Sequence, residues 1–144
     1  MCIRDRLQGI TYHFVCAHQA VYTGFAIHAL DGQQVQIAEP EKALVDLMQF
    51  RRHGHTVDLV LEVLRDNHHQ LNLERLTELV LLAPITVQRI FGFLLEGLSL
   101  DHRALSTAVH KSTSVSKLTS KSDQYNGEWR LYYDPFFTRE MSYA

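Results

Sequence analysis

Residues 37–50 read IAEPEKALVDLMQF, and this stretch decides the fold. Alternating polar and apolar residues predict a strand that ends at Ala38. Pro40 then suits the first turn of a helix, where a backbone N–H has no partner to lose. Glu39 and Glu41 lie at the positive end of that helix dipole, which favours carboxylates. One apolar stripe of this helix consists of Ala43, Leu44, Leu47 and Met48. Lys42, Asp46 and Gln49 lie on the other side of the helix. We therefore expect a sheet before this stretch and helices after it.

Before the stretch, the chain carries the signals of a small antiparallel sheet. Ile10 to Val15 and Val21 to Leu30 are rich in β-branched and aromatic residues, which favour strands. Gly24 indicates a bulge or break in the second run, and Asp31-Gly32 is typical of a tight turn. With Gln34 to Ala38, these runs predict three strands of one sheet.

After the stretch, helical patterns dominate. They predict a helix over 58–65 with Thr56 as its N-cap, and another that begins after the cap Asn72 and ends before Pro84. The clearest helical stripe of apolar residues follows Pro84 and consists of Val87, Ile90, Phe91, Leu94, Leu95 and Leu98. Ser99 or Asp101 would cap a last helix that runs through Val109. Trp129 to Tyr133 predicts a strand that returns to the core, because a lone Trp after a polar segment favours burial. The fold class is α+β: a small antiparallel sheet, a cluster of four to five helices, and a returning C-terminal strand.

Composition suggests four segments. Residues 1–6 (MCIRDR) have no helical or strand period and resemble a translated adaptor hexapeptide from assembled environmental reads, or else a disordered start. Residues 7–111 form the α+β domain. Residues 112–126 are rich in Ser and Thr and read as a mobile polar loop. Residues 127–144 form the C-terminal strand and tail.

Overall composition narrows the function classes. The 144 residues are 46% hydrophobic and 21% charged, with a net charge of −2, so the chain as a whole has no electrostatic attraction to nucleic acid or anionic membrane. No apolar run reaches the length of a membrane span, and the start lacks a secretory signal, so we expect a cytoplasmic protein without membrane partners. Its two cysteines are expected to be reduced.

Catalytic and metal-binding patterns are weak. The sequence has no nucleophile elbow and no glycine-rich phosphate loop, so we expect neither an enzyme nor a cofactor. The pairs His53/His55 and His68/His69 lack the spacing of common zinc sites and are typical of solvated loops. A metal-dependent nuclease or hydrolase, using these histidines with Glu39, Glu41 and Asp46, is the weakest alternative. We interpret Asp46 as a half-buried anchor, bonded to nearby backbone or to Arg51 or Arg52.

A local excess of basic residues supplies the possible partner or phosphate contacts. They are Arg103, Lys111, Lys117, Lys121 and Arg130. Such a segment is usually just solvated, but flexible lysines also suit phosphate backbones without reading bases. A nucleic-acid-binding regulatory module is therefore an alternative function.

The opening stretch, of the form Ile-Ala-x-Pro-Glu-Lys-Ala-Leu-x-Asp-Leu, resembles the central motif of AbiEi-type proteins, the antitoxins of type IV toxin–antitoxin (abortive-infection, phage-defence) systems. The matching motif residues are Pro40, Glu41, Lys42, Leu44, Asp46 and Leu47. Other segments occur in the order of that family, covering about residues 10–98 and the end of the chain: Ile10–Phe14, Gly24–Phe25, Arg89–Glu96 and Trp129–Leu131.

The resemblance implies an N-terminal winged helix-turn-helix that binds operator DNA and represses its own operon. It also implies a C-terminal domain that neutralises a nucleotidyltransferase-like toxin, mostly without a stable complex. Only nine residues precede Ile10, too few for a winged helix. We expect the chain to be the C-terminal antitoxin domain of a truncated reading frame, with operator DNA bound only through the missing domain.

Overall fold

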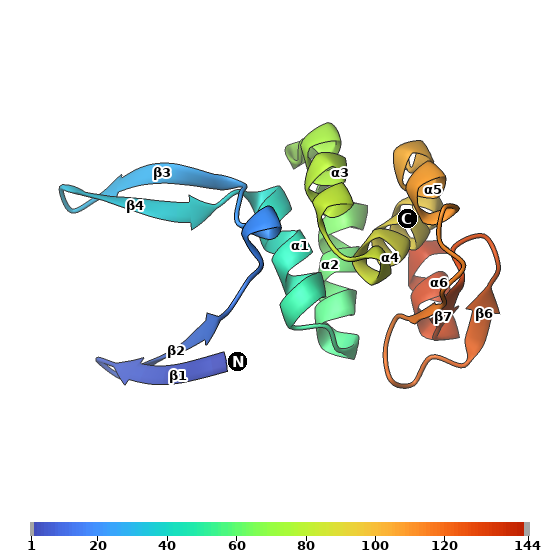
Figure 1. Cartoon of the computed structure of the whole chain (residues 1–144), viewed down its shortest axis with the longest axis horizontal. Coiled ribbons are helices and arrows are strands. Elements are labelled where there is room, and N and C mark those ends of the chain that lie inside the picture. Colours follow the sequence, from blue (N-terminus) through green and yellow to red (C-terminus); the bar gives the residue numbers. More distant parts are fainter. Residues whose placement is uncertain (1, 143–144) are drawn as a thin grey trace.

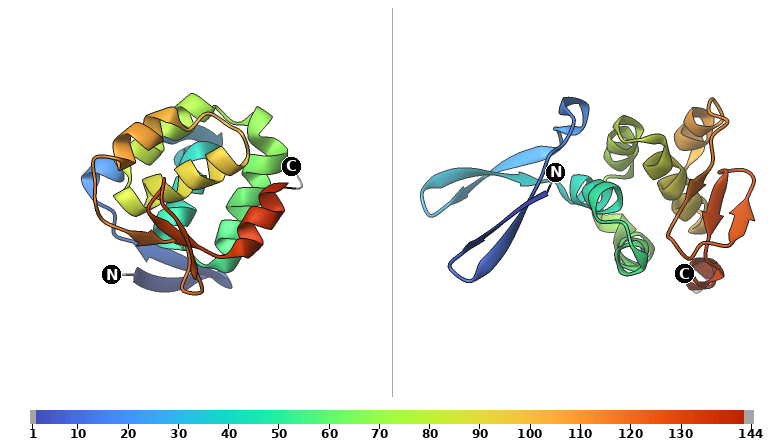
Figure 2. Two further views of the ribbon diagram at one scale, coloured as in Figure 1. Left: turned by 90° about the vertical axis from the view of Figure 1, so that its right-hand side faces the viewer. Right: turned by 60° about the horizontal axis from the view of Figure 1, so that its bottom comes forward.

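The computed structural model describes residues 2–142 and has the expected α+β class. Two β-hairpins project from one side of a helical body, and a small mixed sheet with a last helix covers the other side (Figure 1). Turning the molecule shows that the two hairpins diverge from the first helix like the arms of a V (Figure 2). The motif 37–50 joins the second hairpin to the body, as its sequence predicts.

The first hairpin corrects the expectation that residues 1–6 lack regular structure. Strand β1 (Cys2–Leu7) pairs antiparallel with β2 (Ile10–Val15), from Cys2 opposite Val15 to Leu7 opposite Ile10. Gln8 and Gly9 close the turn at φ 51° and 80°, the left-handed conformation that a two-residue hairpin turn requires. The missing alternation in residues 1–6 has a physical reason: the hairpin is exposed from residue 4 to residue 15, so no buried face imposes a period.

The second hairpin is separate from the first, so the expected single sheet of three strands is wrong. Strand β3 (Phe25–Leu30) pairs only with β4 (Gln33–Ala38), and the predicted turn at Asp31-Gly32 is confirmed. The strand begins at Phe25 and not at Val21, because Val21 is the last residue of a short 3-10 turn, η1 (Gln19–Val21). Gly24 makes the predicted break at φ 81°, where an added Cβ would lie 3.0 Å from Lys42 Cβ.

The helical body follows the predicted periods. Its elements are α1 (Pro40–Phe50), α2 (Gly54–Asn67), the 3-10 turn η2 (His68–Gln70), α3 (Leu73–Leu82), α4 (Ile85–Gly97) and α5 (Arg103–Val109). The cap at Asn72 is confirmed, since its Oδ1 accepts the Arg75 N–H at 3.0 Å. Thr56 is not a cap: the N-cap of α2 is His53, whose Nδ1 accepts the Thr56 N–H at 3.4 Å. The N-cap of α5 is His102, so neither Ser99 nor Asp101 is the cap residue, although Asp101 Oδ1 accepts the Arg103 N–H at 3.2 Å.

The core lies between these helices and the C-terminal sheet. Helix α4 is its centre, because apolar side chains on several of its faces are buried. Fully buried side chains come from every layer of the body: Met48, Val57, Leu64, Leu76, Ile90, Phe91, Leu105, Leu118, Trp129 and Leu131. Burial of this size supplies the main stabilisation, at about 25 cal/mol per Å² of apolar surface.

The C-terminal segment corrects the expectation of a mobile loop over 112–126. Strand β7 (Leu131–Tyr133) pairs in parallel with β5 (Ser116–Lys117) and antiparallel with β6 (Gln124–Asn126), so the polar segment supplies two of the three strands. Leu118 lies fully buried beneath them. The strand expected over 129–133 begins only at Leu131, while Trp129 is buried as predicted. The expected tail contains helix α6 (Pro135–Ser142).

Within residues 2–142, no helix has the length and apolar character required to cross a membrane.

Candidate functional site: a cleft between the hairpins and the first helix

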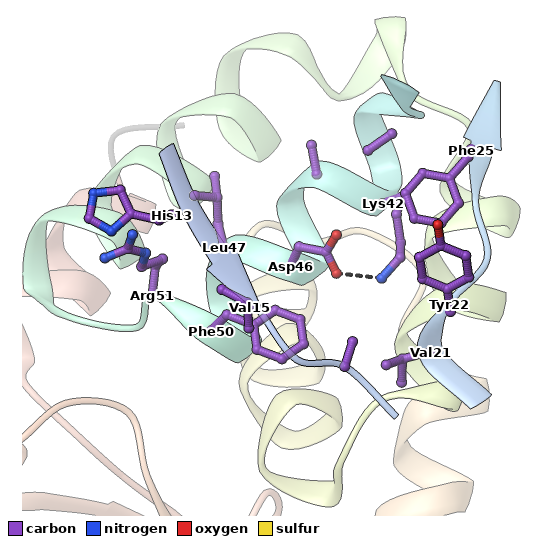
Figure 3. A pocket seen from close by; sticks show the side chains of 13 residues that line it. His13, Val15, Val21, Tyr22, Phe25, Lys42, Asp46, Leu47, Phe50 and Arg51 are labelled. Atoms are coloured by element: carbon purple, nitrogen blue, oxygen red, sulfur yellow. Dashed lines mark hydrogen bonds and ion pairs between the residues drawn. The ribbon is translucent and has the colours of Figure 1, made fainter. Parts of the chain in front are cut away.

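An apolar cleft of about 680 Å³ lies where the two hairpins meet α1 (Figure 3). Its lining comes from β2, the η1 region, the start of β3 and the exposed side of α1. The residues are His13, Val15, Ala17, Val21, Tyr22, Phe25, Ala38, Lys42, Ala43, Asp46, Leu47, Phe50 and Arg51. Six of them lie within residues 37–50, and three of these, Lys42, Asp46 and Leu47, are among the residues that resemble the antitoxin motif.

Lys42 and Asp46 form an ion pair in the cleft, one helical turn apart on α1 (Figure 3). Lys42 is only 3% exposed, which corrects its expected place on the open side of the helix. Its stem packs beneath Gly24, where a side chain would have no room. The half-buried state of Asp46 is confirmed, but its partner is Lys42, whereas Arg52 donates to the Met48 carbonyl at 3.3 Å. A buried ammonium needs this partner, because an unpaired charge in an apolar site is costly.

Aromatic and aliphatic groups make up the rest of the cleft wall. The rings of Tyr22 and Phe25 lie 5.0 Å apart at one end, and Phe50 and Val15 line the cleft between this end and His13 (Figure 3). Tyr22 remains 65% exposed although it is large and apolar. Such an opening binds apolar groups of a partner, with the ion pair as its main polar feature.

The outer end of the cleft is basic. His13 and Arg51 lie together there (Figure 3). Desolvation, followed by the positive charges of Arg51 and then Arg4, lowers the pKa of His13 below its ordinary value. Arg51, which lines the cleft, supplies a fixed positive charge at this rim.

The first hairpin also exposes apolar groups on the face that points away from the cleft. Because side chains alternate along a strand, Ile10, Tyr12 and Phe14 share the face opposite His13 and Val15. All three are exposed, and so are Leu7, Ile27, Leu30 and Ile37 on the hairpins. Exposed apolar side chains gathered on one strand face, as on β2, are typical of interaction sites in folded proteins.

The other side of the motif holds the body together. Glu41 is buried and accepts the Asn72 N–H at 2.7 Å, while Glu39 accepts from Arg75 Nε at 3.0 Å. Leu44 is buried, and Pro40 begins the helix. These contacts to α3 add a tertiary role to the helix-dipole explanation of the two glutamates.

The five basic residues from the sequence have different surroundings. Arg103 is held by Asp101 at 2.9 Å, whereas Lys111, Lys117 and Lys121 are exposed. Arg130 is half-buried and donates to the Ser112 carbonyl at 2.7 Å. Arg130 is thus a structural contact of the C-terminal sheet as well as a basic group.

The carboxylates and histidines of the metal hypothesis bind other partners. Glu39, Glu41 and Asp46 are engaged by Arg75, the Asn72 N–H and Lys42. His53 caps α2, and His68 Nδ1 lies 3.1 Å from the Leu64 carbonyl oxygen. In the described part of the chain, three or more His, Cys, Asp or Glu side chains nowhere gather at metal-binding distance.

Sequence reasoning missed the cleft itself, since it depends on how the two hairpins leave α1. One signal could have indicated part of it: Lys42 and Asp46 have the i, i+4 spacing of a helical ion pair.

Comparison with known proteins finds no match to a family model, a curated protein or a solved structure.

Proposed function

We propose that this chain is a non-enzymatic antitoxin domain that neutralises a nucleotidyltransferase-like toxin, and that it contacts the toxin through the cleft and the exposed hairpin faces. The observation that supports the proposal most is the position of the motif. Lys42, Asp46 and Leu47, which resemble the antitoxin motif, line an open apolar cleft beside two hairpins with exposed apolar side chains.

The chemistry of the cleft supports recognition by contact. Apolar walls bury apolar groups of a partner, and an ion pair at the floor restricts which groups fit. Hairpins of only two strands are marginally stable alone and gain stability when a partner covers them. The motif carboxylates support a structural role, because each already binds a basic group or a backbone N–H. Operator binding would belong to a winged helix-turn-helix, so this proposal is confined to neutralisation.

Co-expression with a nucleotidyltransferase-like toxin, cloned from the neighbouring reading frame if one is found there, tests the proposal. We expect the chain to relieve the growth arrest that the toxin causes. Tyr22→Ser and Val15→Asp should abolish relief, because Tyr22 and Val15 are exposed cleft residues whose changes leave the core intact. The matched controls are Tyr125→Ser and Leu59→Asp, which alter residues of comparable exposure on the C-terminal sheet and α2.

Circular dichroism of each purified variant verifies folding before the growth results are compared. Unrelieved arrest with a folded wild-type chain would refute the antitoxin function. Relief that persists in both cleft variants would instead place the contact outside the cleft.

A further inference from the structure

Arg89 is a buried cation in the middle of α4. Its side chain is 0% exposed, and its guanidinium donates to Ser116 Oγ at 2.9 Å and to Ser112 Oγ at 3.4 Å. Its buried Nε has no hydrogen-bond partner. Neutral hydroxyl groups are thus the side-chain acceptors around a group that is always charged in proteins.

A buried guanidinium normally lies beside a carboxylate, since burying an uncompensated charge costs several kcal/mol. Among residues 2–142, no Asp or Glu oxygen comes within 4.0 Å of either Arg89 or Arg130. Burial, followed by the positive charge of Arg130, lowers the pKa of Arg89. Two guanidinium groups therefore lie near each other without a counter-charge.

Arg130 is held in place by an unusual backbone conformation. Its φ is 49°, in the left-handed region that is unfavourable for a residue with a Cβ atom. In this conformation its carbonyl accepts the Ser116 N–H at 3.0 Å, and its Nη1 donates to the Ser112 carbonyl at 2.7 Å. The strain is consistent with a defined position for the Arg130 guanidinium beside Ser112.

Ser112 forms the solvent side of this cluster. It is half-buried, and its Oγ lies 2.9 Å from Oγ of the exposed Ser114. Its 3.4 Å contact with Arg89 is longer than a normal hydrogen bond, so an anionic oxygen at about 2.8 Å would be a better acceptor. An anion that enters beside Ser114 would replace the Ser112 hydroxyl as the acceptor for Arg89, leave that hydroxyl free to donate, and reach both arginines.

We propose that Arg89 and Arg130, together with the hydroxyls of Ser112 and Ser114, form a binding site for a phosphoryl dianion, either inorganic phosphate or the phosphate of a monoester. A dianion matches the two positive charges, and guanidinium groups bind phosphate oxygens through paired hydrogen bonds. The hydroxyls donate to the remaining oxygens. This site is on the opposite side of the body from the cleft and does not depend on the proposed antitoxin function.

Isothermal titration calorimetry of the full chain with inorganic phosphate, at constant ionic strength, tests the site. We expect saturable binding that Arg130→Gln weakens by about tenfold or more. Arg130→Lys should retain part of the phosphate affinity, because an ammonium group keeps the positive charge but cannot form the paired hydrogen bonds of a guanidinium. The control Arg103→Gln removes a positive charge that is already paired with Asp101, and it should leave phosphate binding unchanged.

Ser112→Asp gives a second test that does not depend on whether the Arg130 variants fold. It places a carboxylate of the same chain beside the guanidiniums, so it should raise the Tm and abolish phosphate binding. A second titration with AMP separates the sources: equal affinity assigns the site to the phosphoryl group alone, and higher affinity assigns it to a nucleotide. Absence of saturable millimolar binding, or a Tm lowered by Ser112→Asp, would overturn the proposal.

Discussion

The backbone N–H of Asn72 donates a 2.7 Å hydrogen bond to Oε1 of Glu41, which joins the starts of two helices that are far apart in the sequence. Asn72 in turn caps α3 by accepting the Arg75 N–H, and Arg75 donates back to Glu39 beside Glu41. The four residues form a closed set of contacts between α1 and α3. They fix the angle at which α1, and with it the cleft, meets the body.

Replacing Glu41 tests this link. Glu41→Ala leaves the Asn72 N–H without its acceptor in a partly buried site, so the free energy of unfolding should fall by about 1–3 kcal/mol. Glu41→Gln keeps an acceptor and should lose less. Urea unfolding measures both, with Glu74→Ala on the exposed side of α3 as the control. Equal stability of Glu41→Ala and the control would contradict the link.

Gly92 provides a sharper test of core packing. A Cβ at this position would lie 2.0 Å from Cζ3 of Trp129, so Gly92→Ala must displace the indole. We expect a loss of roughly 1–3 kcal/mol in unfolding free energy, or more, because overpacked cores relax poorly. Trp129 is the only tryptophan, so its fluorescence should shift to the red as the ring moves toward water.

The matched control for that substitution is Gly54→Ala. Nothing lies within 4 Å of a Cβ at Gly54, the first residue of α2, so this change should be neutral or stabilise by about 0.4–1 kcal/mol. An unchanged fluorescence maximum in Gly92→Ala would contradict the observed contact with Trp129.

Local signals explain why much of the body could be predicted. The Asn72 cap, the boundary at Pro84 and the turn at Asp31-Gly32 each depend on the chemistry of one or two neighbouring residues. Burial of Trp129 was predictable because a large indole rarely stays exposed. Helix α6 was missed, although Pro135 followed by Phe137 and Met141 on one face is a helix-start signal.

Contacts between distant residues explain what the sequence could not reveal. Strand β5 has two residues, and its pairing with β7 depends on chain closure across the polar segment. Leu118 is the main buried apolar residue there, and a single such residue cannot produce the alternating pattern that predicts a strand. The cleft likewise depends on the directions of two hairpins, and the burial of Arg89 depends on the C-terminal segment that packs against α4.

The Asp101–Arg103 ion pair at the start of α5 should contribute to folding stability in a pH-dependent way. Hydrogen bonds from the Arg103 side chain, and then from its backbone N–H, hold the pKa of Asp101 well below its ordinary value. The folded state therefore binds this proton less readily than the unfolded state. The stabilisation is complete above about pH 4 and is lost as the pH falls through the folded-state pKa.

Arg103→Gln should raise the pKa of Asp101 toward about 3.9, the value of a free side chain. A carbon-13 NMR titration of the Asp101 carboxyl group measures it directly. Because both side chains are exposed, added salt should produce a smaller shift in the same direction. A wild-type carboxyl group that titrates at the ordinary value would show that the pair does not persist in solution.

Hydrogen exchange should separate the hairpins from the body. Amides of β2 should exchange many times faster than those of Ile90 and Leu94, because β2 has six exposed side chains and pairs only with β1. Local opening of a two-stranded hairpin costs little, whereas opening α4 requires the core to unfold. Deleting residues 1–16 should accordingly change the Tm by only a few degrees.

The same measurement connects this local instability with the proposed function. A toxin that covers the cleft and hairpin faces should slow exchange in β2 and β3 and leave α5 unchanged, since α5 lies on the far side of the body (Figure 1). The Tyr22→Ser variant should lose that protection, and Tyr125→Ser should keep it. Protection at α5 in place of β2 would move the contact surface away from the hairpins.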